Sequence, residues 1–396
     1  MTRVSRQHVA ATAFVFLAAS VLATSTARGQ QAASQDTATD DARKVEVGLG
    51  GLMQMRYTAN HREPLAAENE WTSGFSVTRV RLILDASYSD RGALVVRAGV
   101  DGGGSFNIER AYADLRFGTT QLRMGQFYLP GAGELYPDPE RTLATDYSPT
   151  GFTFDVGASQ GVMGVFRPGR WKASAVLHSG LRSGFAQAGT EGRADGAATL
   201  YLERNLIGDD WSVFGEAASF RGSPPALKVG LAATYQSGGN TGDTDSLKVL
   251  YVSADVGAKG SGWNALGQFM YQHSERGQGF GIESGQIYDD MGFVVQGGVF
   301  VTRDLEIFLR YDQVIPDGKL REPDVSNGTG TDDFRTLTGG LSLFVLPGRP
   351  SARMTVDYQY MFDAQTTSIV PTAFNAGVFP STGRQSTLRV QFVASF

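Results

Sequence analysis

One serine of this chain lies in a pattern that nucleophilic enzymes use. Residues 157–161 read GASQG and fit the G-x-S-x-G motif around Ser159. In hydrolases that motif needs a sharp turn between a strand and a helix, which exposes the serine hydroxyl. Here the motif lies where a predicted loop enters a predicted strand. We therefore do not assign a nucleophile, and we expect no enzyme activity.

Residues that bind metals or phosphates are sparse. The chain has no cysteine, which excludes thiol nucleophiles and cysteine-based zinc sites. Four histidines occur: His8, His61 in a predicted loop, and His178 and His273 near predicted strand ends. No two of them have the spacing of a helical metal site. The run 101–105, DGGGS, is followed by no predicted helix and is typical of a tight connection between strands. We expect no metal and no cofactor.

Charged side chains form two sets that could act on a permeating solute. The pore-lining candidates lie on the polar face of predicted strands and are Arg79, Arg81, Arg97, Arg110, Arg116, Asp85 and Asp114. The constriction-loop candidates lie within residues 129–158 and are Glu134, Asp138, Glu140, Arg141 and Asp146. An arginine row facing an acidic loop would create a transverse field that filters polar solutes. Two alternatives stay open: the arginines only pair with nearby acids, or the loop is a solvated surface loop.

A period-two alternation predicts the elements that position these charges. Met354, Val356 and Tyr358 share one face of a segment, while Arg353 and Asp357 share the other. Such segments run to about ten residues, the length that crosses a bilayer at a tilt. Short and long connections alternate between them, which is typical of a transmembrane antiparallel β-barrel with short periplasmic turns and long extracellular loops. Sixteen strands are predicted, and they begin near residues 45, 75, 93, 106, 121, 159, 171, 195, 226, 247, 263, 291, 304, 334, 352 and 385.

Two details of the barrel stay open at this level. Leu206–Pro225 could hide two further strands, the first starting at Trp211, which would raise the count from sixteen to eighteen. Residues 58–74 form one of the predicted long loops. If both termini lie on the same side of the membrane, the number of strands must be even.

The chain ahead of the barrel reads as targeting sequence. Residues 1–27 combine Arg3 and Arg6 with an apolar stretch and small residues, the composition of a cleaved secretory signal peptide. Residues 28–44 are polar and form a flexible periplasmic leader, and residues 45–396 form the barrel. The formal net charge of −5 argues against nucleic-acid partners. We expect the outer membrane of a Gram-negative-type bacterium as the location.

Several segments resemble the phosphate-selective porins O and P. FSVTRVRLILDASYSDRGALVVRAGVD (75–101) is similar to the second and third strands of that family. RAYADLRFGTTQLRMGQFYLP (110–130) matches the family segment AYvdyr…vrvGqfk.P, and LERNLIGDDWS…SPPALKVGLAATY (202–235) resembles R.ewnp.g followed by kPal.lG. The resemblance covers most of the mature chain and rests on short motifs.

This resemblance implies a trimeric sixteen-stranded barrel whose third loop folds inward and narrows the pore. It favours a periplasmic connection at residues 211–225, and it implies that Phe396 is the terminal aromatic residue read by the barrel-assembly machinery. Phosphate-specific members are expected to have a basic constriction, whereas residues 129–158 carry five acids and one arginine.

Together these patterns predict an outer-membrane porin, surrounded by lipid, that forms a passive water-filled channel for small anions, phosphate among them, or other polar solutes. One alternative is a barrel enzyme of the lipase or protease type. The other is a closed structural or adhesive barrel, which nothing in the sequence excludes.

Overall fold

The structure is a computed structural model of the whole chain. It describes residues 45–64, 69–88, 90–102, 104–131, 133–135, 137–184, 194–238, 248–276, 286–318, 333–346, 349–365, 370 and 377–396. The predicted signal peptide and leader lie outside the described residues.

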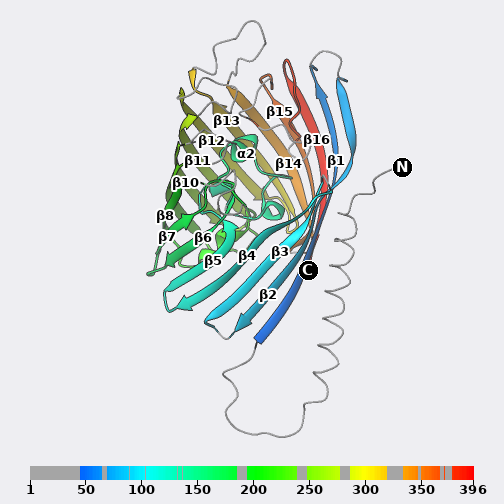
Figure 1. Ribbon diagram of the computed structural model, residues 1–396. Coiled ribbons are helices and arrows are strands. Elements are labelled where there is room, and N and C mark those ends of the chain that lie inside the picture. The colour runs from blue at the N-terminus through cyan, green and yellow to red at the C-terminus, as the bar shows by residue number, and fades with distance from the viewer. Residues whose placement is uncertain are drawn as a thin grey trace, which may run out of the picture. The chain divides into compact units, whose positions relative to one another are not determined.

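The described residues form one closed antiparallel barrel of sixteen strands (Figure 1). The strands are β1 (Val45–Arg62), β2 (Trp71–Tyr88), β3 (Gly92–Asp101), β4 (Phe106–Phe117), β5 (Thr120–Tyr128), β6 (Ala158–Phe166), β7 (Trp171–His178), β8 (Gly196–Ile207), β9 (Ala226–Ser237), β10 (Lys248–Gly260), β11 (Trp263–Arg276), β12 (Gln286–Phe300), β13 (Leu305–Ile315), β14 (Phe334–Leu346), β15 (Arg349–Met361) and β16 (Gln385–Ser395). Neighbouring strands in the sequence pair in order, and β1 closes the ring on β16 from Leu52↔Ser395 to Arg62↔Gln385. The predicted fold class is confirmed.

Apolar side chains cover the outside of the barrel. On β8, Leu200 and Leu202 are exposed, whereas Tyr201 and Glu203 between and beside them point inward and are buried. This is the alternation that a barrel in lipid requires, with an apolar outer face and a polar interior. Among the described residues, no helix is both long and apolar enough to cross a membrane.

The structure corrects one sequence prediction about local structure and settles a second point that the sequence left open. Residues 58–62 belong to β1 rather than to a long loop, so His61 lies on a strand, where its ring is 4.6 Å from that of Trp71. The prediction failed because polar residues such as Asn60 fill inward positions of β1. The segment between β8 and β9 adds no strands; it contains the short 3-10 helix η3 (Trp211–Gly215), and the count stays at sixteen.

One bulge and one glycine shape the wall near the pore. The pairing of β3 with β4 shifts at Arg97/Ala98, so that Arg97 faces Arg110 while Ala98 faces Ile108. Glu109 is the extra residue, and both Glu109 and Arg110 reach interior partners. Gly125 of β5 has a φ of +132°, and a Cβ there would lie 2.3 Å from the carbonyl oxygen of Ala111. A larger residue would strain this part of β5.

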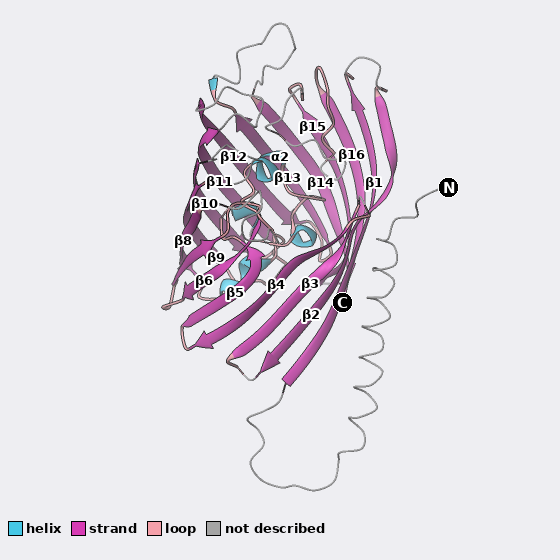
Figure 2. Ribbon diagram, viewed as in Figure 1, coloured by secondary structure: helices cyan, strands magenta, loops and turns pink. Residues whose placement is uncertain are grey.

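The connection between β5 and β6 lies inside the ring of strands. It contains the 3-10 helices η1 (Gly133–Leu135) and η2 (Pro139–Arg141) and the α-helix α2 (Pro149–Thr153), which Figure 2 shows within the barrel. α2 packs on β12 and β13, and η1 packs on β10 and β11. Ser148 caps α2, because its hydroxyl accepts a hydrogen bond from the Gly151 amide. We call residues 129–157 the inner loop.

Candidate functional site

A cavity of about 680 Å³ lies between the inner loop and one side of the barrel. Every described strand residue that lines it belongs to β2 through β8. The cationic lining residues are Arg79, Arg81, Arg110, Arg123, Arg141, Arg167 and Lys172. The acidic lining residues are Asp101, Glu109, Asp138 and Asp155. Cations therefore outnumber acids around this cavity.

Four of the five acids of the inner loop make salt bridges with arginines of the wall. Glu134 lies 3.1 Å from Arg310, and Glu140 lies 3.0 Å from Arg97. Asp138 contacts Arg97 at 3.0 Å and also pairs with Arg110. The predicted loop acids and several predicted wall arginines are thus brought together, which favours direct pairing over a field between two separated charge rows.

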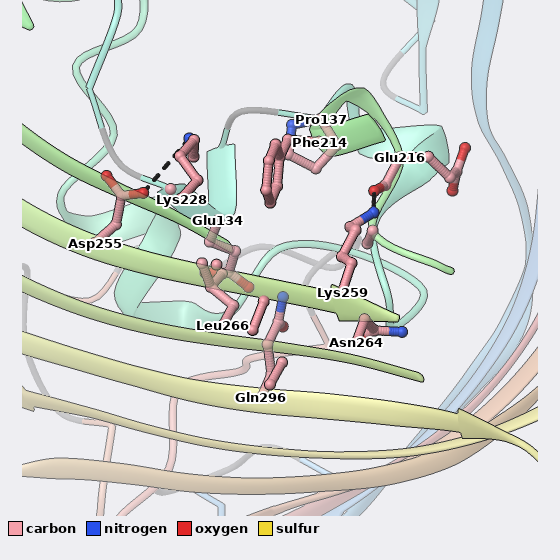
Figure 3. A pocket seen from close by; sticks show the side chains of 15 residues that line it. Glu134, Pro137, Phe214, Glu216, Lys228, Asp255, Lys259, Asn264, Leu266 and Gln296 are labelled. Carbon is pink, nitrogen blue, oxygen red and sulfur yellow. Dashed lines mark hydrogen bonds and ion pairs between the residues drawn. The ribbon is translucent and has the colours of Figure 1, made fainter. Parts of the chain in front are cut away.

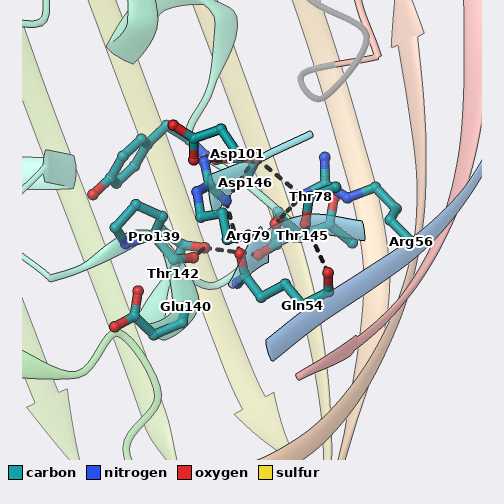
Figure 4. A network of polar contacts seen from close by, with 12 residues as sticks. Gln54, Arg56, Thr78, Arg79, Asp101, Pro139, Glu140, Thr142, Thr145 and Asp146 are labelled. Atoms are coloured by element: carbon teal, nitrogen blue, oxygen red, sulfur yellow. Dashed lines mark hydrogen bonds and ion pairs between the residues drawn. The ribbon is translucent and has the colours of Figure 1, made fainter. Parts of the chain in front are cut away.

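Asp146 is the most enclosed of these acids. Its carboxylate lies 3.0 Å from the Arg56 guanidinium and 3.2 Å from that of Arg79, and Gln54 accepts a further hydrogen bond from Arg79 (Figure 4). Burial alone would raise the pKa of Asp146, but Arg79 and Arg56 outweigh it and lower the pKa below the ordinary aspartate value. The carboxylate therefore stays charged and ties the loop to β1 and β2.

Asp138 behaves in the same way. Its burial opposes ionisation, yet the guanidinium groups of Arg110 and Arg97 lower its pKa below the ordinary value. Arg110 also lies over the Tyr128 ring, with its guanidinium carbon 4.8 Å from the ring centre. This part of the cavity wall combines an aromatic face with a charge pair.

Arg141 is the exception on the inner loop. It is exposed, it lines the cavity, and its side chain makes no hydrogen bond or salt bridge to any residue that the structure describes. Arg141, the one cation of this segment, is therefore exposed at the cavity, which Asp138 and Asp155 of the same loop also line.

The remaining pore-lining candidates divide into three groups. Arg81 pairs with Asp101 and Glu109, both of which line the cavity with it. Arg97 and Asp114 are buried behind the lining. Asp85 and Arg116 are exposed and are not among the residues that line the cavity.

The predicted candidates did not include six charged residues that line the cavity: Asp101, Glu109, Arg123, Asp155, Arg167 and Lys172. Arg123 was left off the predicted polar face, but it lines the cavity and holds Asp114 by two hydrogen bonds of 2.8 and 2.9 Å. Glu109 was missed because the bulge at Arg97/Ala98 changes which residues of β4 face inward. Arg123 lies opposite Asp114 in the pairing of β4 with β5. A search for oppositely charged residues at paired positions of neighbouring strands could have identified Arg123.

The inner loop is fixed to the opposite wall by hydrogen bonds to its backbone. Arg353 donates to the carbonyl of Thr142 at 2.7 Å, and the Asp357 carboxylate accepts from the amide of Thr145 at 2.9 Å. Asp357 is itself held by Arg389 at 2.7 Å, and all three charged side chains are buried. Asp357 and Arg389 are paired, as buried charges require, whereas Arg353 contacts backbone carbonyls and its Nε has no hydrogen-bond partner among the described residues.

The catalytic candidates do not form a hydrolytic site. Ser159 is buried on β6, and its hydroxyl lies 2.7 Å from that of Ser183. His178 is bonded to Thr199 at 3.1 Å and to the amide of Gly180. In the described part of the chain, no group of three or more His, Asp or Glu side chains is placed to hold a metal ion.

No protein-family model matches this sequence. No curated protein sequence matches it either. Solved structures do match its fold. An anion-selective porin from Comamonas acidovorans has a TM-score of 0.61 at 13% identity, over 89% of this chain and 100% of that porin.

Two further structures are similar over nearly the whole barrel. OmpT, an outer-membrane protein of Vibrio cholerae, has a TM-score of 0.58 at 15% identity, over 91% of this chain and all of OmpT. The outer-membrane channel DcaP of Acinetobacter baumannii has a TM-score of 0.57 at 11% identity, over 91% of this chain and 100% of DcaP. This chain therefore shares the fold of outer-membrane porins and channels.

Proposed function

We propose that this chain forms a passive outer-membrane channel that prefers small anions or neutral polar solutes. The observation that carries the proposal is the cavity between the inner loop and β2–β8, whose lining has more cations than acids and includes the exposed Arg141. Because seven cations and four acids line this space, and Arg141 has no salt-bridge partner among the described residues, we expect the net field there to be positive. A positive field in a narrow frame raises the local concentration of anions.

The fold supports this location and this activity. It is shared with an anion-selective porin and with an outer-membrane channel, and the apolar outside of the barrel suits lipid. In the same proposal the signal peptide is cleaved, Phe396 is read by the barrel-assembly machinery, and three copies assemble as a trimer. OmpT has been solved in a trimer form. We assign no enzyme activity, since Ser159 is buried and bonded to Ser183.

The test is conductance in planar bilayers with the reversal potential measured in a salt gradient. We expect discrete open-channel steps and a reversal potential closer to the equilibrium potential of the anion. Arg141→Gln should shift the reversal potential toward the equilibrium potential of the cation. A unit charge about 8 Å from an ion in water contributes roughly 0.5 kcal/mol, which changes the permeability of each ion about twofold in opposite directions. Phosphate titration of the current tests whether phosphate binds.

Arg335→Gln is the matched control, because Arg335 is exposed, lies at the end of β14 and pairs with Asp363. It should leave the reversal potential unchanged. A barrel that shows no steps would be closed, which is the structural alternative. A cation-selective channel, or one indifferent to Arg141→Gln, would contradict the proposal. Hydrolase activity that Ser159→Ala removes would favour the enzyme alternative.

A further inference from the structure

The connection between β8 and β9, residues 208–225, reaches across the barrel from the strands that it joins. Phe220 packs against Phe300 of β12 and Phe344 of β14, with ring centres 5.1 and 4.9 Å apart. Arg221 donates a hydrogen bond of 2.6 Å to the carbonyl of Phe300. We call residues 208–225 the crossing segment, because its contacts lie on strands several positions away from β8 and β9.

The crossing segment meets the inner loop. The amide of Ala217 donates to the carbonyl of Arg141 at 3.0 Å, and Ala217 packs against Leu143 and Ala144. Lys259 of β10 holds the segment from the wall by donating to the carbonyls of Val213 at 2.8 Å and Ala218 at 3.1 Å, and to that of Glu216. Gly215 lines the large cavity together with Arg141. Two separate parts of the chain thus narrow the same space.

Glu216 lies at this meeting point with no hydrogen-bond partner for its carboxylate. Both carboxylate oxygens are buried, and neither has a partner among the described residues. Figure 3 shows the carboxylate turned away from the Lys259 ammonium, which contacts the backbone oxygen of the same residue. An unpartnered buried carboxylate is costly unless it is neutral or lies in a positive field.

The charges around Glu216 come from four elements. They are Arg353 of β15, Arg141 of the inner loop, Lys259 of β10 and Glu306 of β13. Three of these four are cations, and Arg141 is the one exposed to the cavity. The charge on Glu216 therefore decides how much of the positive field of Arg141 and its neighbours reaches the lumen.

We infer that the crossing segment is a second constriction of the channel, and that Glu216, through Arg141, is a specificity-determining residue for ion selectivity. The inference rests on the proposed channel function. Glu216 acts as a positioning and charge-compensating residue, since its oxygens do not touch the lumen. Its protonation removes one negative charge next to three cations, and anion preference should then rise.

The direction of the pH dependence follows from the surroundings of Glu216. Burial raises its pKa to about 7, although Arg353, Arg141 and Lys259 act in the opposite sense. Above that pH the carboxylate is charged and offsets the arginine field. Below it the carboxyl is neutral, and the cations are left uncompensated.

The reversal potential is measured between about pH 8 and about pH 6, where ordinary carboxyls and arginines do not titrate but histidines do. The wild-type channel should become up to about fourfold more anion-selective across this range, since one unit charge near the ion path changes the permeability of each ion about twofold in opposite directions. Glu216→Gln should start near the low-pH selectivity and lose most of this change, and any remainder is that of the histidines. Glu275→Gln, in an exposed pair with Lys248, should behave as the wild type.

Three outcomes separate the possibilities. If Glu216→Gln keeps the wild-type pH dependence, the inference is wrong while the channel stands. If the pH dependence of the reversal potential is removed by Glu306→Gln and not by Glu216→Gln, the titrating group is Glu306 and the inference is again overturned. If the wild type shows no open-channel steps, the proposed function itself fails.

A second measurement does not depend on conduction. Infrared difference spectra of the folded barrel should show a protonated-carboxyl band that titrates near pH 7, and Glu216→Gln should lower the amplitude of that band. Heat-modifiable migration on gels checks that the variant is folded. A band of unchanged amplitude in Glu216→Gln would overturn the assignment.

Discussion

The two sides of the barrel wall treat their inward-facing charges differently. On β2–β8, which we call the open wall, the side chains of Arg79, Arg110 and Arg123 keep 11%, 23% and 22% of their surface exposed, while those of Arg81 and Arg97 keep 1% and 4%. On β9–β16 together with β1, the packed wall, those of Arg310, Arg353 and Arg389 keep 1% or less. The inner loop lies against the packed wall and leaves the cavity beside the open wall.

This difference shows that one alternating pattern can build two kinds of surface. Arginines of the packed wall hold the loop backbone, as Arg353 does at Thr142. Arginines of the open wall are also paired, and some of their partners line the cavity, as Asp138 does for Arg110 and Glu109 does for Arg81. We therefore expect charge on the packed wall to serve mainly stability and, under the proposed channel function, charge on the open wall to serve mainly selectivity.

The largest expected effect on stability is at Asp357 of the packed wall. Asp357→Asn leaves the Arg389 guanidinium, which is fully buried, without its charged partner, and it also weakens the contact to the Thr145 amide. Removing one partner of a buried ion pair costs about 3–5 kcal/mol. Urea unfolding of the folded barrel in detergent should show a lower midpoint.

Asp114→Asn is the matched change on the open wall. Its partner Arg123 is partly exposed and also lies over the Tyr112 ring, 3.8 Å from the ring centre. Water and the aromatic face can therefore replace part of the lost interaction, and a cost of about 1–2 kcal/mol is expected. Equal losses at Asp357 and Asp114 would break the distinction between the two walls.

A pH-dependent effect is expected at Asp146. Because its pKa is lowered in the folded barrel, its contribution is complete above the ordinary aspartate value of about 3.9 and is lost as the pH falls through the lowered value. Asp146→Asn should cost about 2 kcal/mol at neutral pH. The gap from the wild type should close below about pH 4. A gap that does not change with pH would show that Asp146 does not anchor the loop through its charge.

The sequence was sufficient for the barrel but only partly for the site. Alternation in segments such as 353–362 predicts which side of a strand faces inward, because a pleated strand has a strict period of two. It cannot predict what lies opposite. The partners of the loop acids, Arg56 and Arg310, are distant in the sequence, and only the folded loop brings them to Asp146 and Glu134.

The other differences have local causes. The bulge at Arg97/Ala98 placed Glu109 inside, although strict alternation would have turned it outward. The crossing segment has no alternation, and its role depends on contacts with Phe300 and Phe344 of remote strands. Neither feature has a period that a single sequence reveals.

The central claim is that solutes pass along the open wall, and thiol labelling during conductance tests it most directly because the chain has no cysteine. Gln121→Cys places a thiol in the cavity lining, while Thr338→Cys places one on the packed wall at a fully buried inward position. A water-soluble sulfonate-bearing thiol reagent should reduce the current through Gln121→Cys and leave Thr338→Cys unchanged. Block of Thr338→Cys with no effect at Gln121→Cys would contradict the account.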